Sequence, residues 1–250
     1  MSETTLNSIV LRRKDSGETD RRLTVLTREV GKIDLIAKGA RKAASRLAGS
    51  SDPLTVATFS VALGKKNRFI TQSQPIQSFR GLRTDFDRLS YALALCELYA
   101  VLLPWEEPQP EAFDLLIESL GFLEKHPKPL VALAWAEVQL LMQSGFMPQF
   151  DVCVVTGEAP SETNPFISPS AGGYVSEVAS RDYRDRFRTR VELLYGLSKM
   201  VEQPVPPANF KFVEEGLADL LPFWQHIAET ALPANVAAIS ELRHQMVTES

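Results

Sequence analysis

The sequence predicts an α+β protein, in which a small antiparallel barrel precedes a helical domain, and three patterns indicate this. In residues 1–80, β-branched residues alternate with polar ones in short pieces bounded by Gly, Asn and Asp, as in half-buried strands. After Phe79 the apolar residues are spaced by threes and fours, as on the buried face of a helix. In residues 148–180, prolines and glycines interrupt this spacing and indicate an irregular insert.

Five strands are expected in the first part, over residues 8–13, 22–28, 32–38, 54–63 and 68–79. In the third of them, Ile33, Leu35 and Ala37 point to one side and the residues between them to the other, as in a barrel wall. Five short antiparallel strands fit a closed barrel, for which the OB-fold is the commonest candidate and an SH3-like barrel the alternative. The segment between the third and fourth strands is predicted to be a loop or short helix that carries basic residues outward.

Helices are expected where the spacing of threes and fours persists. The expected ranges are 82–103, ended by Pro104, then 110–125, 129–144, 181–200, 212–230 and 235–247. The predicted domains are an OB-fold at 1–80, a helical domain at 81–147 and 181–250, and the insert at 148–180 between its two parts.

The composition favours a cytoplasmic protein. At 250 residues and 44% apolar, the chain has enough material for a large core. Its apolar runs fall short of the roughly 20 residues that span a membrane, so no membrane association is expected. The polar start MSETTLNS is the reverse of a secretory signal, and two cysteines do not form a disulfide framework.

Charge is divided unevenly along the chain. The net charge is −4, but residues 1–80 hold 15 Lys and Arg against 7 Asp and Glu, and the remainder holds 12 against 24. A basic domain attracts phosphate, whereas the acidic remainder limits unspecific binding, so a nucleic-acid partner is expected. Ordinary solubility charge is the alternative. The candidate DNA-binding residues are Arg12, Arg13, Arg21, Arg22, Arg28, Lys32, Lys38, Arg41, Lys42, Arg46, Lys65, Lys66 and Arg68.

Catalytic patterns are missing from the sequence. His126, His226 and His244 have no nucleophile or carboxylate at a motif spacing, and neither a P-loop, a dinucleotide fingerprint nor a zinc-protease motif occurs. The chain is therefore expected not to be an enzyme and to need no cofactor. An enzyme whose site assembles from scattered residues is one alternative, and a general OB-fold RNA-binding protein is the other.

The run GETDRRLTVLTREVGKIDLIAKGARKAASRLAG, residues 17–49, resembles the RecO family of bacterial DNA repair mediators, and the resemblance continues in order through the chain. It implies an OB-fold before a helical domain. It also implies binding of single- and double-stranded DNA, annealing of complementary strands, and cooperation with RecR in loading RecA onto strands coated by single-strand-binding protein. In such proteins the barrel meets RecR and the helical domain receives the acidic tail of single-strand-binding protein.

Members of that family often carry a four-cysteine zinc finger in the insert. Here Cys153 occupies the first ligand position, but Thr156, Ser176 and Ala179 stand at the other three. Hydroxyl and methyl groups do not replace thiolates in a tetrahedral zinc site, so no metal is expected. The insert is interpreted as a degenerate zinc finger.

A second basic cluster follows the insert and is a possible site for a partner or a second DNA segment. Its members are Arg181, Arg184, Arg186, Arg188 and Arg190. The alternative is a solvated helix face, on which Asp182 pairs with Arg186 and Asp185 lies close to Arg188.

Overall fold

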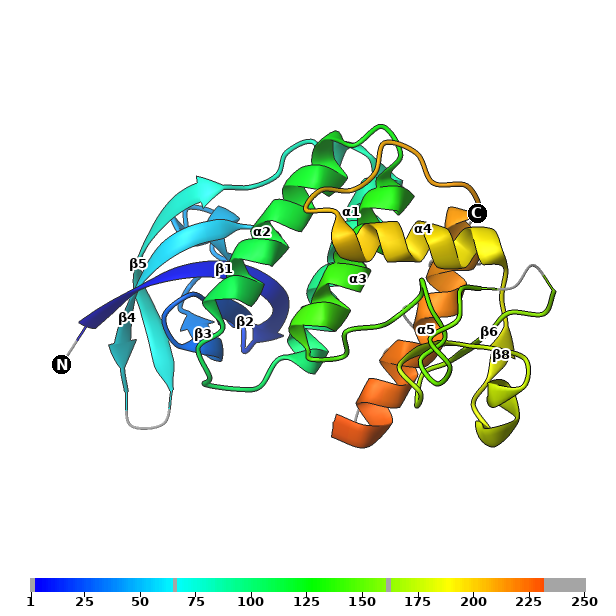
Figure 1. Cartoon of the computed structure of the whole chain (residues 1–250). Coiled ribbons are helices and arrows are strands. Elements are labelled where there is room, and N and C mark those ends of the chain that lie inside the picture. Colours follow the sequence, from blue (N-terminus) through cyan, green and yellow to red (C-terminus); the bar gives the residue numbers. More distant parts are fainter. Residues whose placement is uncertain (1–2, 65–66, 161–162, 232–250) are drawn as a thin grey trace. The chain divides into compact units, whose positions relative to one another are not determined.

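The computed structural model describes residues 3–64, 67–160 and 163–231 and forms two compact units, Met1–Glu124 and Lys125–Ser250 (Figure 1). The first unit holds the barrel together with two helices, because α1 (Phe86–Leu102) packs against β1 and β2. This unit thus extends past residue 80, where the sequence places the end of the OB-fold domain. Within the described residues, no helix has the length and apolar character required to cross a bilayer.

The barrel confirms the five predicted strands. They are β1 (Glu3–Ser16), β2 (Asp20–Thr27), β3 (Gly31–Ala37), β4 (Val56–Leu63) and β5 (Arg68–Gln77). The order around the closed barrel is β1-β2-β3-β5-β4, and β3 pairs with β5 in parallel through Ile36 and Phe69. A consecutive meander would pair β3 with β4 instead, so the order is that of an OB-fold.

The barrel interior follows the predicted alternation. Ile33, Leu35 and Ala37 are at most 1% exposed, whereas Asp34 and Ile36 between them are half-buried. The segment between β3 and β4 consists of turns and one 3-10 turn, Gly49–Ser51, and it carries its basic side chains outward as predicted.

The first two helices begin and end close to the predicted residues. A 3-10 turn, Leu82–Thr84, precedes α1, and the Asp85 carboxylate accepts a hydrogen bond from the Arg88 amide as an N-cap. The second helix, α2 (Pro110–Lys125), begins at its proline.

The linker between α1 and α2 contacts β3 of the barrel. The Glu106 amide donates to the Lys32 carbonyl at 2.9 Å, and a side chain on Gly31 would begin 1.9 Å from the Glu107 carbonyl oxygen. Gly31 also has a φ of +77°, which disfavours other residues. Glycine at this position therefore lets the linker approach the barrel.

The second unit contains α3 (Pro129–Gln143), α4 (Val191–Glu202) and α5 (Val213–Ala231). Trp135 and Trp224 are buried, and the Trp224 indole donates to the buried Glu137 carboxylate at 3.0 Å. The helices expected at 129–144 and 212–230 are confirmed. The helix expected at 235–247, which includes His244, lies outside the described residues.

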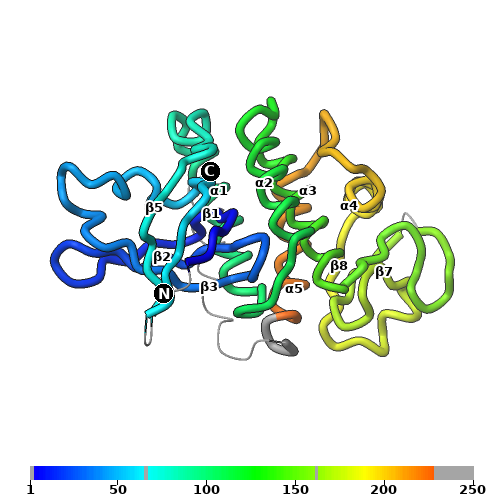
Figure 2. The backbone as a smooth tube through the Cα atoms, turned by 90° about the vertical axis from the view of Figure 1, so that its left-hand side faces the viewer, coloured from blue at the N-terminus to red at the C-terminus, as the bar shows by residue number. Residues whose placement is uncertain are grey.

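The insert forms a small three-stranded sheet of β6 (Phe166–Ser168), β7 (Gly173–Val175) and β8 (Phe187–Arg188), which Figure 2 shows as a traced backbone with β7 and β8 labelled. The expectation that helical structure resumes at Arg181 is wrong. Residues 179–182 form a 3-10 turn, and Phe187 pairs with the buried Ile167 across β6 and β8. Because this pairing covers Ile167, the chain stays extended until α4 begins at Val191.

Candidate nucleic-acid interface

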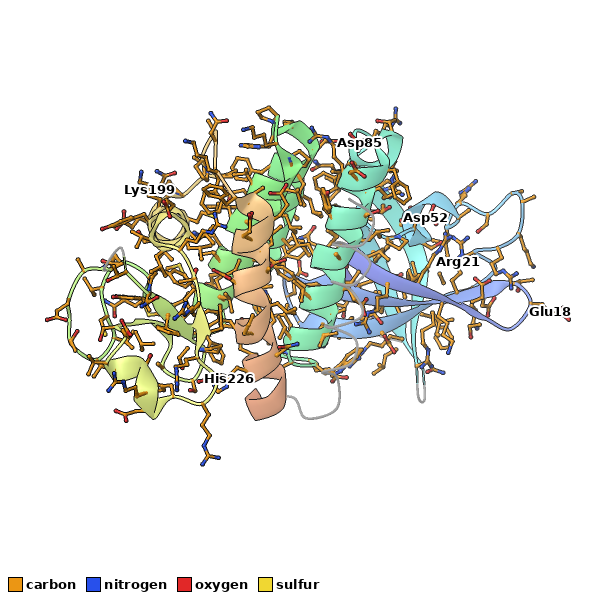
Figure 3. The ribbon with its side chains drawn as sticks, turned by 90° about the vertical axis from the view of Figure 1, so that its right-hand side faces the viewer. Glu18, Arg21, Asp52, Asp85, Lys199 and His226 are labelled. Atoms are coloured by element: carbon orange, nitrogen blue, oxygen red, sulfur yellow. The ribbon has the colours of Figure 1, made fainter. Side chains whose placement is uncertain are left out.

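Seven predicted arginines of the first unit form ion pairs with carboxylates of that unit. The pairs are Arg12–Glu97, Arg13–Asp52, Arg21–Asp52 at 3.2 Å, Arg22–Asp34 at 3.7 Å, Arg28–Asp114 at 2.6 Å, Arg41–Asp15 at 3.4 Å and Arg68–Glu106 at 3.0 Å. Figure 3 labels Arg21 and Asp52 as one example. A paired carboxylate offsets the charge that each guanidinium offers to phosphate. The positive potential expected from the sequence is therefore much reduced at these positions.

Lys32 lies in the interior, 2% exposed, and does not belong to the surface that the sequence assigned to it. Its ammonium donates to the Ala100 carbonyl at 2.7 Å and lies 4.6 Å from the centre of the Trp105 ring. The Ala100 carbonyl belongs to the last turn of α1, where carbonyls lack helical partners. Lys32 thus caps a helix, and burial lowers its pKa from 10.5 to about 8.

The titration of Lys32 gives a testable pH dependence. Between pH 8 and 10.5 the unfolded chain holds a proton on Lys32 that the folded chain has lost, so folding becomes more favourable as the pH rises. The free energy of unfolding is expected to rise relative to that of Lys32→Met by up to about 1.4 kcal/mol per pH unit in this window. Urea denaturation of both proteins at several pH values measures the difference, and a constant difference would contradict the assignment.

Three predicted cations remain on the surface and form no ion pair among the described residues: Lys38, Lys42 and Arg46, called here the loop cluster. All three are exposed on the segment that follows β3. Lys65 and Lys66, also predicted, lie outside the described residues.

The loop that carries these cations is fastened to the β1–β2 hairpin. The Asp20 carboxylate accepts from the Gly39 amide at 2.8 Å, and the Arg41 amide donates to the Thr19 carbonyl at 2.9 Å. The Gly39 amide is also the main reason why the pKa of Asp20 is lowered. At the start of the loop, the Lys38 ammonium lies 4.3 Å from the centre of the Phe69 ring on β5. These contacts hold the backbone that presents the loop cluster.

A hollow of about 480 Å³ lies on the outer side of β2 and β3. It is lined by Arg22, Asp34, Ile36, Leu63, Gly64, Asn67, Arg68 and Glu106. OB-fold proteins bind nucleic acid on the face of strands 2 and 3, beside the loops after strands 1 and 4. The hollow has this location, but both of its arginines are paired with carboxylates.

Glu106 is a residue of this hollow that sequence reasoning missed. It lies in the linker between α1 and α2, far from Arg68 along the chain, and only the seating of that linker on β3 brings the two together. Its contact with Arg68 lowers the pKa of the Glu106 carboxyl, chiefly through the hydrogen bond between them. Nothing in the sequence around Glu106 indicated that it would form an ion pair with Arg68.

The insert brings together positions that the sequence resemblance interprets as those of a degenerate zinc finger. The Cys153 thiol accepts a hydrogen bond from the Ser176 amide at 3.2 Å, and the Ser176 hydroxyl accepts from the Ala179 amide at 3.4 Å. Burial raises the pKa of the thiol, but hydrogen bonds from Thr156 and Ser176 outweigh this and bring it to about 7. One thiol, two hydroxyls and a methyl group do not fit a structural zinc ion. The interpretation as a degenerate zinc finger stays a prediction.

Glycine is needed in this insert for a steric reason. Gly172 and Gly173 have φ angles of +86° and +153°, and a side chain on Gly173 would begin 2.0 Å from the Gln149 carbonyl oxygen. Gln149 and the Gly172–Tyr174 backbone exchange hydrogen bonds at 3.0 and 2.8 Å. Backbone contacts thus fasten the start of the insert to β7.

The second basic cluster is exposed throughout, and within the part of the chain that the structure describes its arginines have no ion pairs. The alternative of a helix face with Asp182–Arg186 and Asp185–Arg188 contacts is wrong, because this segment is not helical. The Asp185 carboxylate instead accepts from the Ser168 hydroxyl at 2.7 Å and from the Ser170 amide at 2.7 Å. Although burial raises the pKa of Asp185, these hydrogen bonds prevail and lower it.

Together these features define a class of protein in which an OB-fold barrel with a cationic loop precedes a helical domain that carries a small β-sheet insert. Two family models match the chain: the Recombination protein O N-terminal model over residues 1–79 and the Recombination protein O C-terminal model over residues 83–234. The chain belongs to the Recombination protein O (RecO) family.

Three relatives illustrate the similarity, and each is called DNA repair protein RecO. The one from Myxococcus xanthus is 35% identical over 80% of this chain and 84% of its own length. Those from Heliobacterium modesticaldum and Roseiflexus sp. are 38% and 36% identical over 67% and 66% of this chain. The matches span 62% and 58% of the length of these last two relatives.

Proposed function

We propose that this protein acts in recombinational DNA repair as a mediator that binds single- and double-stranded DNA and anneals complementary strands. The observation that carries the proposal is the loop cluster, whose three exposed cations form no ion pairs among the described residues and lie on a loop that is hydrogen-bonded to the β1–β2 hairpin. Membership in the RecO family supports it, since the similar proteins are named for DNA repair.

The physical role is to reduce the repulsion between two polyanions. Lysine and arginine side chains that contact phosphate release counterions, which gives affinity without sequence preference. Contacts restricted to the sugar–phosphate backbone of DNA leave the base edges free to pair. A protein of this kind brings strands together and catalyses no bond chemistry. By its family, it is further proposed to act with RecR in loading RecA onto DNA coated by single-strand-binding protein.

Annealing of two complementary oligonucleotides that carry a fluorescence donor and acceptor tests the proposal. We expect the protein to accelerate pairing of DNA at low salt, and we expect the acceleration to fall as salt rises because the contacts are ionic. No acceleration would refute the proposal, and acceleration of RNA pairing alone would favour the general RNA-binding alternative. Incubation of labelled DNA with a divalent metal ion should leave it intact, and reproducible cleavage would reveal an enzyme.

A further inference from the structure

We propose that Arg186, Arg188 and Arg190, called here the arginine strip, form a second binding site for the phosphate backbone of single-stranded DNA. This inference rests on the proposed function and extends it, because a second DNA site would let one molecule hold both strands that are to pair. Three properties of the strip support it: the exposure of its cations, the absence of ion pairs to them among the described residues, and the aromatic rings beside it.

The strip is an extended chain with all three arginines on its solvent side. Arg186, Arg188 and Arg190 are exposed, whereas Phe187 and Thr189 between them are half-buried. Phe187 pairs with Ile167, and the Thr189 hydroxyl donates to the Asp219 carboxylate on α5. Alternate residues of a strand are about 6.7 Å apart. The strip thus presents three exposed cations at alternate positions of one short segment, which suits several phosphates of a strand better than a single anion.

The guanidinium groups of the strip are available to an external anion. The ion pairs that offset the barrel arginines have no counterpart here among the described residues. The Asp185 carboxylate, the acidic group next to Arg186 in sequence, is engaged by the Ser168 and Ser170 hydroxyls and the Ser170 amide. These hydrogen bonds occupy the oxygens of the Asp185 carboxylate, which keeps its negative charge but forms no ion pair with Arg186.

Aromatic rings and backbone contacts orient the arginines. The Arg188 guanidinium lies 5.8 Å from the centre of the Phe166 ring, its partner across β6 and β8, and that of Arg190 lies 5.1 Å from the Phe212 ring. Arg186 donates to the Tyr183 carbonyl at 2.9 Å. Phe166 is half-buried and Phe212 is 38% exposed, so part of each ring remains open. Cations beside open aromatic rings are typical of sites for single-stranded nucleic acid.

The salt dependence of single-stranded DNA binding tests the strip in the full-length chain. A variant with Arg186→Gln, Arg188→Gln and Arg190→Gln loses three phosphate contacts, so its slope of log K against log salt should be shallower than that of the natural protein by about 2. The matched control is Lys125→Gln, Lys128→Gln and Lys199→Gln, which removes the same charge from exposed lysines of the same unit and should leave the slope nearly unchanged.

Two further measurements separate the possible outcomes. Replacing the three arginines by lysine keeps the charges and should restore most of the slope, whereas a folding defect of the glutamine variant would appear in its circular dichroism spectrum. Polyglutamate serves as a probe for an acidic peptide. If the glutamine variant bound polyglutamate more weakly than the natural protein but kept the same salt slope for DNA, the strip would be a site for an acidic peptide and not for DNA. If the glutamine variant keeps the salt slope of the natural protein, and the natural protein anneals DNA, only the strip is refuted. If the natural protein does not anneal DNA, the proposed function is refuted.

Discussion

Replacing Lys38, Lys42 and Arg46 together by glutamine is expected to weaken binding of single-stranded DNA by at least about tenfold at 0.15 M salt and to make the salt slope shallower by about 2. These residues are the predicted barrel cations that are exposed and form no ion pair among the described residues. A titration of fluorescently labelled oligonucleotide at several salt concentrations measures both quantities.

The matched control for this variant is again Lys125→Gln, Lys128→Gln and Lys199→Gln, because it changes the net charge equally at other exposed positions. Arg28→Gln is a second comparison, since Arg28 is held by Asp114 at 2.6 Å and is expected to add little to DNA affinity. If Arg28→Gln weakened binding as much as the loop-cluster variant does, the paired arginines would be the contact surface instead.

The second large effect is expected at Gly31. Gly31→Ala should lower the free energy of unfolding of the first unit by about 3 kcal/mol. Alanine is strained at a positive φ, and its methyl group would also collide with the Glu107 carbonyl oxygen. The linker that Lys32 and Glu106 hold must then move away from β3. Urea denaturation followed by circular dichroism measures the loss, and hydrogen exchange of the β3 amides locates it.

Gly17→Ala is the matched control for that substitution. Gly17 has a similar φ of +65°, but a side chain there would meet no atom within 4 Å. Only the conformational cost of about 1 kcal/mol is expected. Equal destabilisation by the two substitutions would show that the linker does not depend on its close approach to the barrel.

The strands and most of the helices could be predicted because they depend on neighbouring residues. Alternation of Ile33, Leu35 and Ala37 with polar residues fixes which side of β3 is buried, and Pro104 and Pro110 bound the helices on either side of the linker. The exception is the segment before Val191. Its spacing fits a helix, but pairing of Phe187 with Ile167 outweighs this local preference.

The candidate site was predicted only in part, because the sequence shows which residues are charged and not which charges meet. Arg12 pairs with Glu97 across 85 positions, and Arg28 binds Asp114 across 86. Lys32 looks like any strand-end lysine, yet it caps α1 from inside the unit. Sequence reasoning therefore overestimated the basic surface of the barrel.

The sequence by itself determined the barrel, the helices and the asymmetry of charge, since periodicity and composition are properties of the chain alone. The tertiary structure decided which cations remain available to a ligand. Ion pairs such as Arg68–Glu106, and the engagement of Asp185 by Ser168 and Ser170, depend on segments that only folding brings within a few ångströms. Coulomb energy falls with distance and is screened by water and salt, so these contacts exist only once the fold has formed.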